Sequence, residues 1–368
     1  MKKNVVREVW KCEEDTNAGV VCKPNALSLL FFPPSLLILA SRFSPHSALP
    51  SSRNTMPSPP HAAPSPAIHT LTADDGILLA YATWEPSEPA PSSTTPSILL
   101  LHGWSGSRRY WDPAIQTLLA QGCRVVAPDL RWHGGSGKSP TNHTVARLAD
   151  DLAHLLAALD RPAASMTAVG ASMGSAVLWA HAQRHGSVGL GRHVYVDQAP
   201  LQNRVPGWAL GSRGCHDADT LAALQAAVQG DAVAFAAGNA AACLAQPIPE
   251  GVAALAAAET ALADVRGLAE LMADHTANDW RPVLPTIPCE ALIIIGGKSA
   301  IFPPEGCAAV AEMMAPPGRA AVVTFTAGGH WLYLEQPAAF GRLVGAFARG
   351  GLQGVKGWGD VGGVAGGV

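Results

Sequence analysis

A serine between two glycines has the clearest capacity for chemistry in this chain of 368 residues. The run Gly-Ala-Ser-Met-Gly at 170–174 follows an apolar strand-like segment and precedes a helix-like one. This arrangement is typical of a nucleophile elbow, a turn so tight that glycines must flank the serine. The turn would hold the Ser172 hydroxyl above the edge of a sheet, with the next backbone N–H at the positive end of a helix. The pattern therefore predicts Ser172 as a nucleophile.

The segments that would position this serine alternate between strand and helix. Strand-like runs occupy residues 68–72, 77–83, 97–101, 124–127, 165–169, 291–295 and 321–325. Continuous apolar runs such as 97–101 are expected of strands buried on both faces of a sheet. Helical spacing follows most of these runs, which predicts an α/β fold with a mostly parallel sheet and right-handed crossovers.

Two further loops make the pattern specific. His-Gly-Trp at 102–104 follows one strand-like run, and Pro-Asp-Leu-Arg-Trp-His-Gly-Gly-Ser at 128–136 follows the next. Together with the serine elbow and in this order, they resemble the α/β-hydrolase fold family over about residues 68–348. More narrowly, they resemble its esterases, lactonases and cofactor-free haloperoxidase-like enzymes. The resemblance implies an oxyanion hole made by the backbone N–H groups of Trp104 and Met173, which would stabilise a tetrahedral intermediate.

Other residues of these loops are interpreted as structural. His102, Asp129, Arg131 and His133 are more simply explained as braces of the turns than as chemical groups. Trp132 stands where the family commonly has glycine, which predicts a change in that turn.

The resemblance also selects one of the 13 histidines as the catalytic base. His330 follows Gly-Gly on the loop after the last strand-like run and precedes Glu-Gln-Pro and a helix, where the family keeps its catalytic histidine. An imidazole with a pKa near neutrality on such a loop can take the proton of the serine and return it.

The acid of the triad is where the sequence departs from the family. The family usually has Gly-x-x-Asp after the strand at 291–295, but here Ser299 stands at the position of the aspartate. A serine cannot carry the negative charge that stabilises an imidazolium. Some branches place the acid one strand earlier, where this chain has Asp197. We therefore choose Asp197, with Glu305 as the alternative; a purely structural Asp197 that caps the start of the next lobe is the competing interpretation.

The composition predicts the domain organisation. Residues 67–199 and 282–349 would form the α/β-hydrolase core, and the alanine-rich residues 200–281 a helical cap. In the family such a cap shapes the substrate pocket. Residues 200–281 of this chain carry few charges, which favours a neutral, fairly apolar small-molecule substrate. We expect residues 1–66 to be a disordered extension or targeting segment and residues 350–368 a disordered tail.

The N-terminal segment leaves two interpretations open. Its Ser, Pro and Ala content and its lack of acidic residues between Asp15 and Asp74 are typical of a transit peptide, whereas the acidic run at 13–15 is not. The alternative is that translation starts at Met56. Both place the protein inside the cell, in the cytoplasm or, with a genuine transit peptide, in a plastid or mitochondrion. The apolar run at 26–40 is short and contains two prolines, so we expect no transmembrane anchor.

The overall composition excludes several classes of function. A net charge of −3 with 14% charged residues gives no nucleic-acid footprint. The seven cysteines are scattered and odd in number, which argues against a disulfide framework and favours a reducing compartment. We find no metal-ligand spacing and no nucleotide-binding motif, and therefore expect neither a metal nor a cofactor.

These features predict a serine hydrolase that cleaves a carboxylic ester or related acyl compound through an acyl-enzyme, with Ser172, His330 and Asp197 as the triad. Serine at the elbow argues against epoxide hydrolase or haloalkane dehalogenase chemistry, which needs a carboxylate nucleophile. Lactone, thioester or carbon–carbon bond hydrolysis, or perhydrolysis, at the same site remains an alternative. A ligand-binding receptor of the same fold with little turnover is the alternative of another class.

Overall fold

The computed structural model describes residues 10–15, 19–24, 65–87, 95–159, 166–245 and 247–362. The chain divides into two units, Met1–Pro59 and Pro60–Val368. In the first unit, β1 (Trp10–Asp15) and β2 (Gly19–Pro24) pair antiparallel. This hairpin differs from the disorder that we expected there, and Val20 and Val21 are residues that favour strands. The other residues up to 64, on which that prediction also falls, lie outside the described part of the chain.

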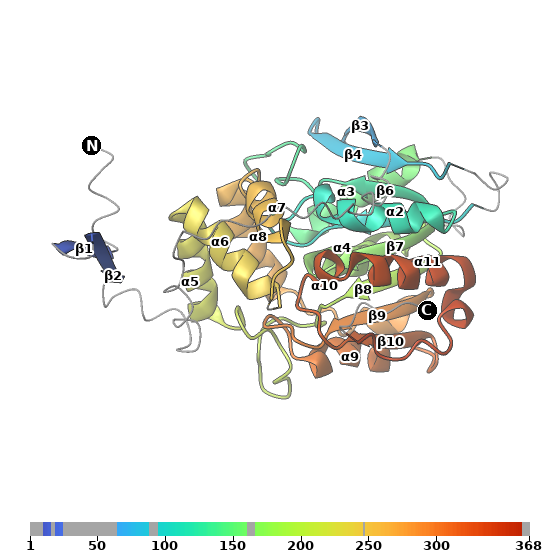
Figure 1. The fold of residues 1–368 in the computed structure, drawn as a ribbon. Coiled ribbons are helices and arrows are strands. Elements are labelled where there is room, and N and C mark those ends of the chain that lie inside the picture. The colour runs from blue at the N-terminus through green and yellow to red at the C-terminus, as the bar shows by residue number, and fades with distance from the viewer. Residues whose placement is uncertain are drawn as a thin grey trace, which may run out of the picture. The chain divides into compact units, whose positions relative to one another are not determined.

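The second unit is built on an eight-stranded sheet in the order β10-β9-β8-β7-β5-β6-β4-β3 (Figure 1). Its strands are β3 (Ala67–Thr72), β4 (Leu78–Trp84), β5 (Ser97–Leu101), β6 (Arg124–Pro128), β7 (Met166–Ala171), β8 (Arg192–Val196), β9 (Glu290–Gly296) and β10 (Ala320–Phe325). Pairing is antiparallel from β3 to β4 and from β4 to β6, and parallel across the rest of the sheet. The predicted α/β-hydrolase fold, with its mostly parallel sheet, is confirmed.

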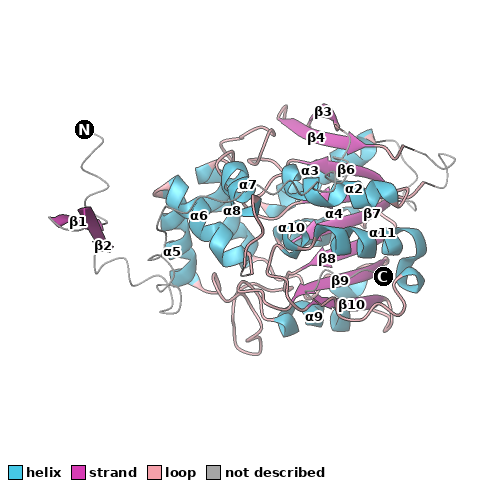
Figure 2. Cartoon of the chain, in the orientation of Figure 1, coloured by secondary structure: helices cyan, strands magenta, loops and turns pink. Residues whose placement is uncertain are grey.

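Helices cover both faces of this sheet (Figure 2). They are α2 (Asp112–Ala120), α3 (Val145–Ala158), α4 (Met173–His185), α9 (Pro304–Met313), α10 (Leu332–Glu335) and α11 (Pro337–Gly354), with the short 3₁₀ helices η3 (Arg108–Trp111) and η5 (Leu284–Thr286). Successive residues of the buried strand β5 point to opposite faces, so Leu99 and Leu101 join one apolar core and Ile98 and Leu100 the other. The continuous apolar run of this strand follows from its burial on both sides.

A helical insertion lies between β8 and β9 and gathers at one end of the sheet (Figure 1). Its helices are α5 (Ala218–Gln229), α6 (Ala232–Cys243), α7 (Val252–Thr260) and α8 (Val265–Ala277). Asp217, Asp231 and Asp264 directly precede α5, α6 and α8, and each side chain accepts hydrogen bonds from the first turn of its helix. These caps mark where three of the helices of the insertion begin.

The C-terminal segment also differs from the expected disorder. Helix α11 continues to Gly354, and Val361 beyond it pairs with the edge strand β10. The N–H of Val361 donates to the carbonyl of Thr324 at 2.8 Å, and the N–H of Thr326 donates to the carbonyl of Val361 at 3.0 Å. An edge strand offers unpaired backbone groups, and the tail satisfies some of them. Residues 363–368 lie outside the described part of the chain.

Within the described residues, no helix combines the length and the apolar character needed to cross a bilayer.

Candidate active site

The serine elbow has the strained geometry that its sequence predicts. Strand β7 ends at Ala171, α4 begins at Met173, and Ser172 between them has φ 51° and ψ −122°. A Cβ on Gly170 would lie 2.4 Å from the carbonyl carbon of Gly174, and a Cβ on Gly174 would lie 2.4 Å from the carbonyl oxygen of Leu101. The backbones cross too closely for any side chain at either glycine, which fixes the turn and leaves the Ser172 side chain partly exposed.

His330 and Asp197 meet in the structure. The Nδ1 of His330 donates to the Oδ2 of Asp197 at 2.6 Å, with His330 5% exposed and Asp197 fully buried. Asp197 follows the last residue of β8, and His330 lies on the loop between β10 and α10. The N–H of Ser172 donates to the carbonyl of Val196 at 2.8 Å, so the serine turn lies against the strand that ends at Asp197. All three residues therefore lie at the carboxyl edge of the sheet, where the active sites of open α/β folds are found.

The loop after β9 donates hydrogen bonds to the Asp197 carboxylate and has Ser299 where the family usually has its acid. The N–H of Gly296 donates to Oδ1 at 2.9 Å, and the hydroxyl of Ser299 donates to Oδ2 at 2.7 Å. Glu305, the alternative acid, is exposed in the first turn of α9. Among the described residues, the carboxylate that is bonded to His330 is that of Asp197.

The hydroxyl of Ser172 is bonded to a residue that our sequence analysis did not consider. It donates to the Oε1 of Gln198 at 3.4 Å, and the Nε2 of Gln198 donates to the carbonyl of Ala199 at 2.9 Å. Gln198 is 2% exposed. Within the described part of the chain, no hydrogen bond joins Ser172 to His330 in this state. The one sequence signal for Gln198 is its position directly after the acid at a strand end.

The loop after β5 passes directly beside the elbow. A Cβ on Gly103 would lie 3.1 Å from the Cβ of Ser172. Trp104 follows Gly103 and Met173 follows Ser172, so both candidate oxyanion N–H groups belong to residues next to the point of closest approach. The indole of Trp104 packs edge to face on Phe235 of α6, with ring centroids 5.7 Å apart, and its Nε1 donates to the carbonyl of Leu268 in α8 at 2.9 Å. The insertion thus contacts the loop that would hold the oxyanion.

Two buried histidines brace these loops, as we interpreted them. The Nε2 of His102 accepts the N–H of Leu130 at 2.9 Å, and the Nε2 of His133 accepts the N–H of Ser105 at 3.2 Å. Burial lowers the pKa of both imidazoles, so both remain neutral. A neutral ring can accept at Nε2 while Nδ1 donates to a backbone carbonyl, which matches their contacts.

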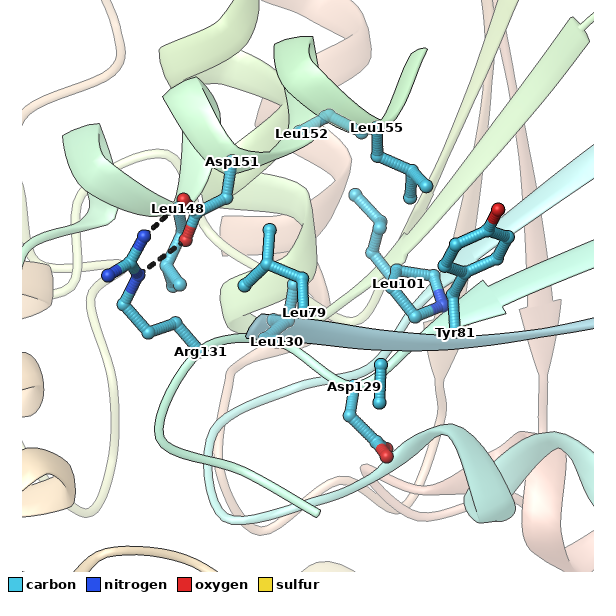
Figure 3. Close-up of a pocket in the computed structure, with 12 residues that line it drawn as sticks. Leu79, Tyr81, Leu101, Asp129, Leu130, Arg131, Leu148, Asp151, Leu152 and Leu155 are labelled. Carbon is cyan, nitrogen blue, oxygen red and sulfur yellow. Dashed lines mark hydrogen bonds and ion pairs between the residues drawn. The ribbon is translucent and has the colours of Figure 1, made fainter. Parts of the chain in front are cut away.

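Asp129 and Arg131 are structural as well. Asp129 accepts the N–H of Arg108 at 2.8 Å and that of Gly135 at 2.9 Å. Arg131 is fully buried and forms ion pairs with Asp75 and Asp151, both at 2.6 Å. Figure 3 shows the latter pair at the side of a small hollow lined mainly by leucines of β4, β5 and α3. Its cavity of about 20 Å³ has room for about one water, and Ser172 is not among its lining residues.

The carboxylate of Glu335 links the loop after β10 to the helical insertion. Glu335 accepts the N–H of Gly329 at 2.6 Å and the N–H of Ala245, at the end of α6. The N–H of Trp331 donates to the carbonyl of Cys243 at 3.0 Å. Burial raises the pKa of Glu335 above its ordinary value. The His330 loop is thereby tied on both sides to the same helix end.

Comparison with protein families gives a match over most of the chain. A family model described as "Alpha/beta hydrolase family" matches residues 98–343. A non-heme chloroperoxidase of Streptomyces lividans is 36% identical over 91 residues, which cover 25% of this chain and 31% of that protein. A non-heme haloperoxidase of Rhodococcus erythropolis is 30% identical over 130 residues, which cover 35% of this chain and 44% of that protein. The chain therefore spans less than half the length of these curated relatives.

Solved structures match over more of the chain. An esterase from Exiguobacterium antarcticum superposes with a TM-score of 0.69 at 21% identity, covering 76% of this chain and 98% of that one. At this identity the likeness shows the fold alone.

Proposed function

The chain belongs to the alpha/beta hydrolase family, and we propose that it hydrolyses a carboxylic ester or related acyl compound with Ser172 as the nucleophile. The observation that carries the proposal is the 2.6 Å hydrogen bond from His330 to the buried Asp197, at the same sheet edge as the strained Ser172 turn. A histidine held by a buried carboxylate, at the same sheet edge as a partly exposed hydroxyl, supports acyl transfer.

In the proposed mechanism, the Oγ of Ser172 attacks the acyl carbon while the Nε2 of His330 takes the hydroxyl proton. Asp197 holds His330 in the tautomer with its proton on Nδ1 and stabilises the imidazolium that forms. The N–H groups of Trp104 and Met173 donate to the oxyanion of the tetrahedral intermediate. His330 then gives its proton to the leaving alcohol, and a water molecule activated by the same imidazole hydrolyses the acyl-enzyme.

The resting hydroxyl must change partner before it reacts. It is bonded to Gln198 in this structure, and the mechanism requires it to turn from this amide to the Nε2 of His330. Hydrogen bonds of this kind are often formed only when substrate is present. One weak contact is lost in this step, at 3.4 Å from an amide oxygen.

The helices α5 to α8 act as the cap in this proposal. Trp104 and Phe235 bring apolar rings together between the oxyanion loop and α6. We therefore propose a neutral, fairly apolar substrate. Hydrolysis of lactones or thioesters, and perhydrolysis with peroxide as the acceptor, would use the same atoms. Rates of the purified protein on a panel of these substrates distinguish these activities from ester hydrolysis.

The proposal is tested with Ser172→Ala. We expect hydrolysis of p-nitrophenyl acetate and butyrate to fall about a thousandfold or more, with loss of labelling by a fluorophosphonate probe. Ser136→Ala is the control, because Ser136 is also a hydrogen-bonded serine but lies at the turn after β6. Turnover that survives in Ser172→Ala would exclude the mechanism.

The acid is tested in parallel. Asp197→Asn leaves His330 without its carboxylate and should lower kcat about ten-thousandfold. Glu305→Gln should leave kcat within about twofold, because Glu305 is exposed on α9. The reverse result would assign the role to Glu305.

A ligand-binding receptor is the second candidate, and the Ser172–Gln198 hydrogen bond favours it. A hydroxyl bonded to an amide oxygen is not activated, and the site could then bind an acyl compound without cleaving it. A wild-type protein that shows no burst with p-nitrophenyl esters, while both it and Ser172→Ala bind an ester stably, would select the receptor.

A further inference from the structure

The Asp197 carboxylate is held by a specific set of donors. It is fully buried, and Oδ1 accepts the N–H of Gly296 at 2.9 Å and the thiol of Cys307 with Sγ at 4.0 Å. The other oxygen, Oδ2, accepts two donors: the Nδ1 of His330 at 2.6 Å and the hydroxyl of Ser299 at 2.7 Å. Ser299 and His330 therefore share a single carboxylate oxygen, although they come from the loops after β9 and β10.

The hydroxyl of Ser299 has one direction in which to donate. Its oxygen accepts the N–H of Ile301 at 3.2 Å and that of Phe302 at 3.3 Å. Because these two contacts occupy the acceptor positions of the hydroxyl, its proton is left for Asp197. The residue is also enclosed: Ser299 is 2% exposed, and the Nη1 of Arg213 donates to its carbonyl at 2.8 Å.

We propose that Ser299 is a positioning residue of the triad: its fixed hydroxyl orients the Asp197 carboxylate towards His330. The proposal rests on the proposed function. A charge-assisted hydrogen bond stabilises the ionised carboxylate and limits its rotation. A serine at this position thus contributes no charge to the triad but fixes the side chain that does.

Loss of this donor has a chemical consequence with a defined sign. A carboxylate with one donor fewer is more basic, so it interacts more strongly with the imidazolium form of His330 and raises the pKa of that ring. It also turns more freely, which weakens the alignment of His330 with Ser172. Both effects act through Asp197, whereas a purely structural role of Ser299 would produce neither.

Other ionisable groups lie near Asp197 and His330, and the Ser299→Ala substitution leaves all of them in place. They are Cys243 of α6, Arg213 before α5, Cys307 and Glu305 of α9, and Tyr333 and Glu335 of α10. Burial raises the pKa of both thiols and of the Glu335 carboxyl. A shift in the titration of His330 between two proteins that differ only at residue 299 is therefore assigned to the lost hydroxyl.

The first experiment compares Ser299→Ala with Ser136→Ala in the full chain, using p-nitrophenyl butyrate. One charge-assisted hydrogen bond corresponds to a loss of about tenfold or more in kcat, with KM within about twofold of the wild type. The acidic limb of the kcat/KM profile should move to higher pH in Ser299→Ala and stay in place in Ser136→Ala. Equal losses in the two variants with an unmoved acidic limb would show that Ser299 only supports the fold, which overturns the proposal.

The second experiment needs no turnover. The imidazole of His330 is titrated by NMR in Ser172→Ala and in Ser172→Ala/Ser299→Ala, with assignment by the signal lost in His330→Gln. We expect the pKa of His330 to be higher in the double variant, and an unchanged pKa would contradict the proposal. Because this measurement does not depend on catalysis, it tests Ser299 even if Ser172→Ala retains turnover and the proposed function fails.

Discussion

At the scale of single residues, the hydroxyl of Ser172 is bonded to one acceptor in the structure, and the proposed mechanism requires a second. In the resting state it is bonded to Gln198, whose amide is fixed by its own hydrogen bond to Ala199. In the proposed mechanism, the hydroxyl must leave this amide before His330 can take its proton. Gln198 would then stabilise an unreactive state of the proposed nucleophile, by about 1 kcal/mol or less for a neutral hydrogen bond of this length.

We predict that Gln198→Met, which keeps the length of the side chain and removes the amide, speeds the reaction of Ser172 with a fluorophosphonate. The expected increase in the second-order rate constant is about two- to fivefold, the equivalent of a weak hydrogen bond. Gln202→Met is the control, because Gln202 is also buried but donates to the sulfur of Met272. Slower labelling in Gln198→Met alone would mean that the amide helps to present the hydroxyl.

The residues that sequence alone could assign are those whose role is set by local geometry. The glycines around Ser172 predict a tight turn. The apolar run at 97–101 predicts a strand and coincides with β5 (Ser97–Leu101). The contacts of Ser299 and Gln198 were not predictable, because they depend on side chains that two adjacent strand ends bring together. The structure shows what Ser299 contacts at the position where the family usually has its aspartate: its hydroxyl donates to the carboxylate of Asp197, which follows the neighbouring strand β8.

At the scale of elements, the turn after β6 carries a bulky residue in a backbone conformation suited to glycine. Trp132, at the position where the family commonly has glycine, has φ 69° and is fully buried. Its Nε1 donates to the carbonyl of Ser139, and its own carbonyl accepts the N–H of Asp264, the cap of α8, both at 2.8 Å. The turn thus keeps a left-handed residue, and the tryptophan fills the space beneath the insertion.

We predict that Trp132→Gly lowers the free energy of unfolding although it relieves backbone strain. The relief is about 1 kcal/mol, whereas the loss of a buried aromatic side chain costs about 3–5 kcal/mol. Urea unfolding should therefore show a net loss of about 2 kcal/mol or more. Asn142→Gly, at an exposed residue with φ 64°, should change stability by less than about 1 kcal/mol. A stabilised Trp132→Gly would show that strain outweighs packing at this turn.

At the scale of the whole molecule, the structure described near the two ends of the chain could not be predicted from the local sequence. The segment after α11 has a glycine-rich composition with no periodic pattern, yet Val361 pairs with β10. That contact depends on a free sheet edge formed by residues elsewhere in the chain, so the sequence around Val361 does not predict it. The alternation of strands and helices, in contrast, follows from the burial of each segment and was sufficient to predict the fold.

Burial of neutral histidines couples the stability of the molecule to pH. Burial lowers the pKa of several imidazoles: His102, His133, His181, His193 and His275. The unfolded chain takes up protons on these rings below pH 6.5, while the folded protein does not. Their contribution to stability is therefore complete above pH 6.5 and is lost as the pH falls towards the folded values.

His275 in α8 gives the cleanest test, since burial alone lowers its pKa, from 6.5 to about 4. The ring is 3% exposed, and its Nδ1 has no partner among the described residues. We predict that the free energy of unfolding of His275→Leu falls less between about pH 7 and pH 5 than that of the wild type, by about 1–2 kcal/mol. Urea unfolding at the two pH values measures the difference.

Carboxyl groups do not account for this difference. The pKa values of Asp74 and Asp75 are lowered from 3.8 by hydrogen bonds to arginine, so their contributions are lost below the window. Burial raises the pKa of Asp112 and Glu335, whose protonation on acidification has the opposite sign. Both effects are common to the two proteins and cancel in the comparison. Parallel losses in wild type and variant would mean that His275 takes up its proton in the folded state as readily as in the unfolded chain.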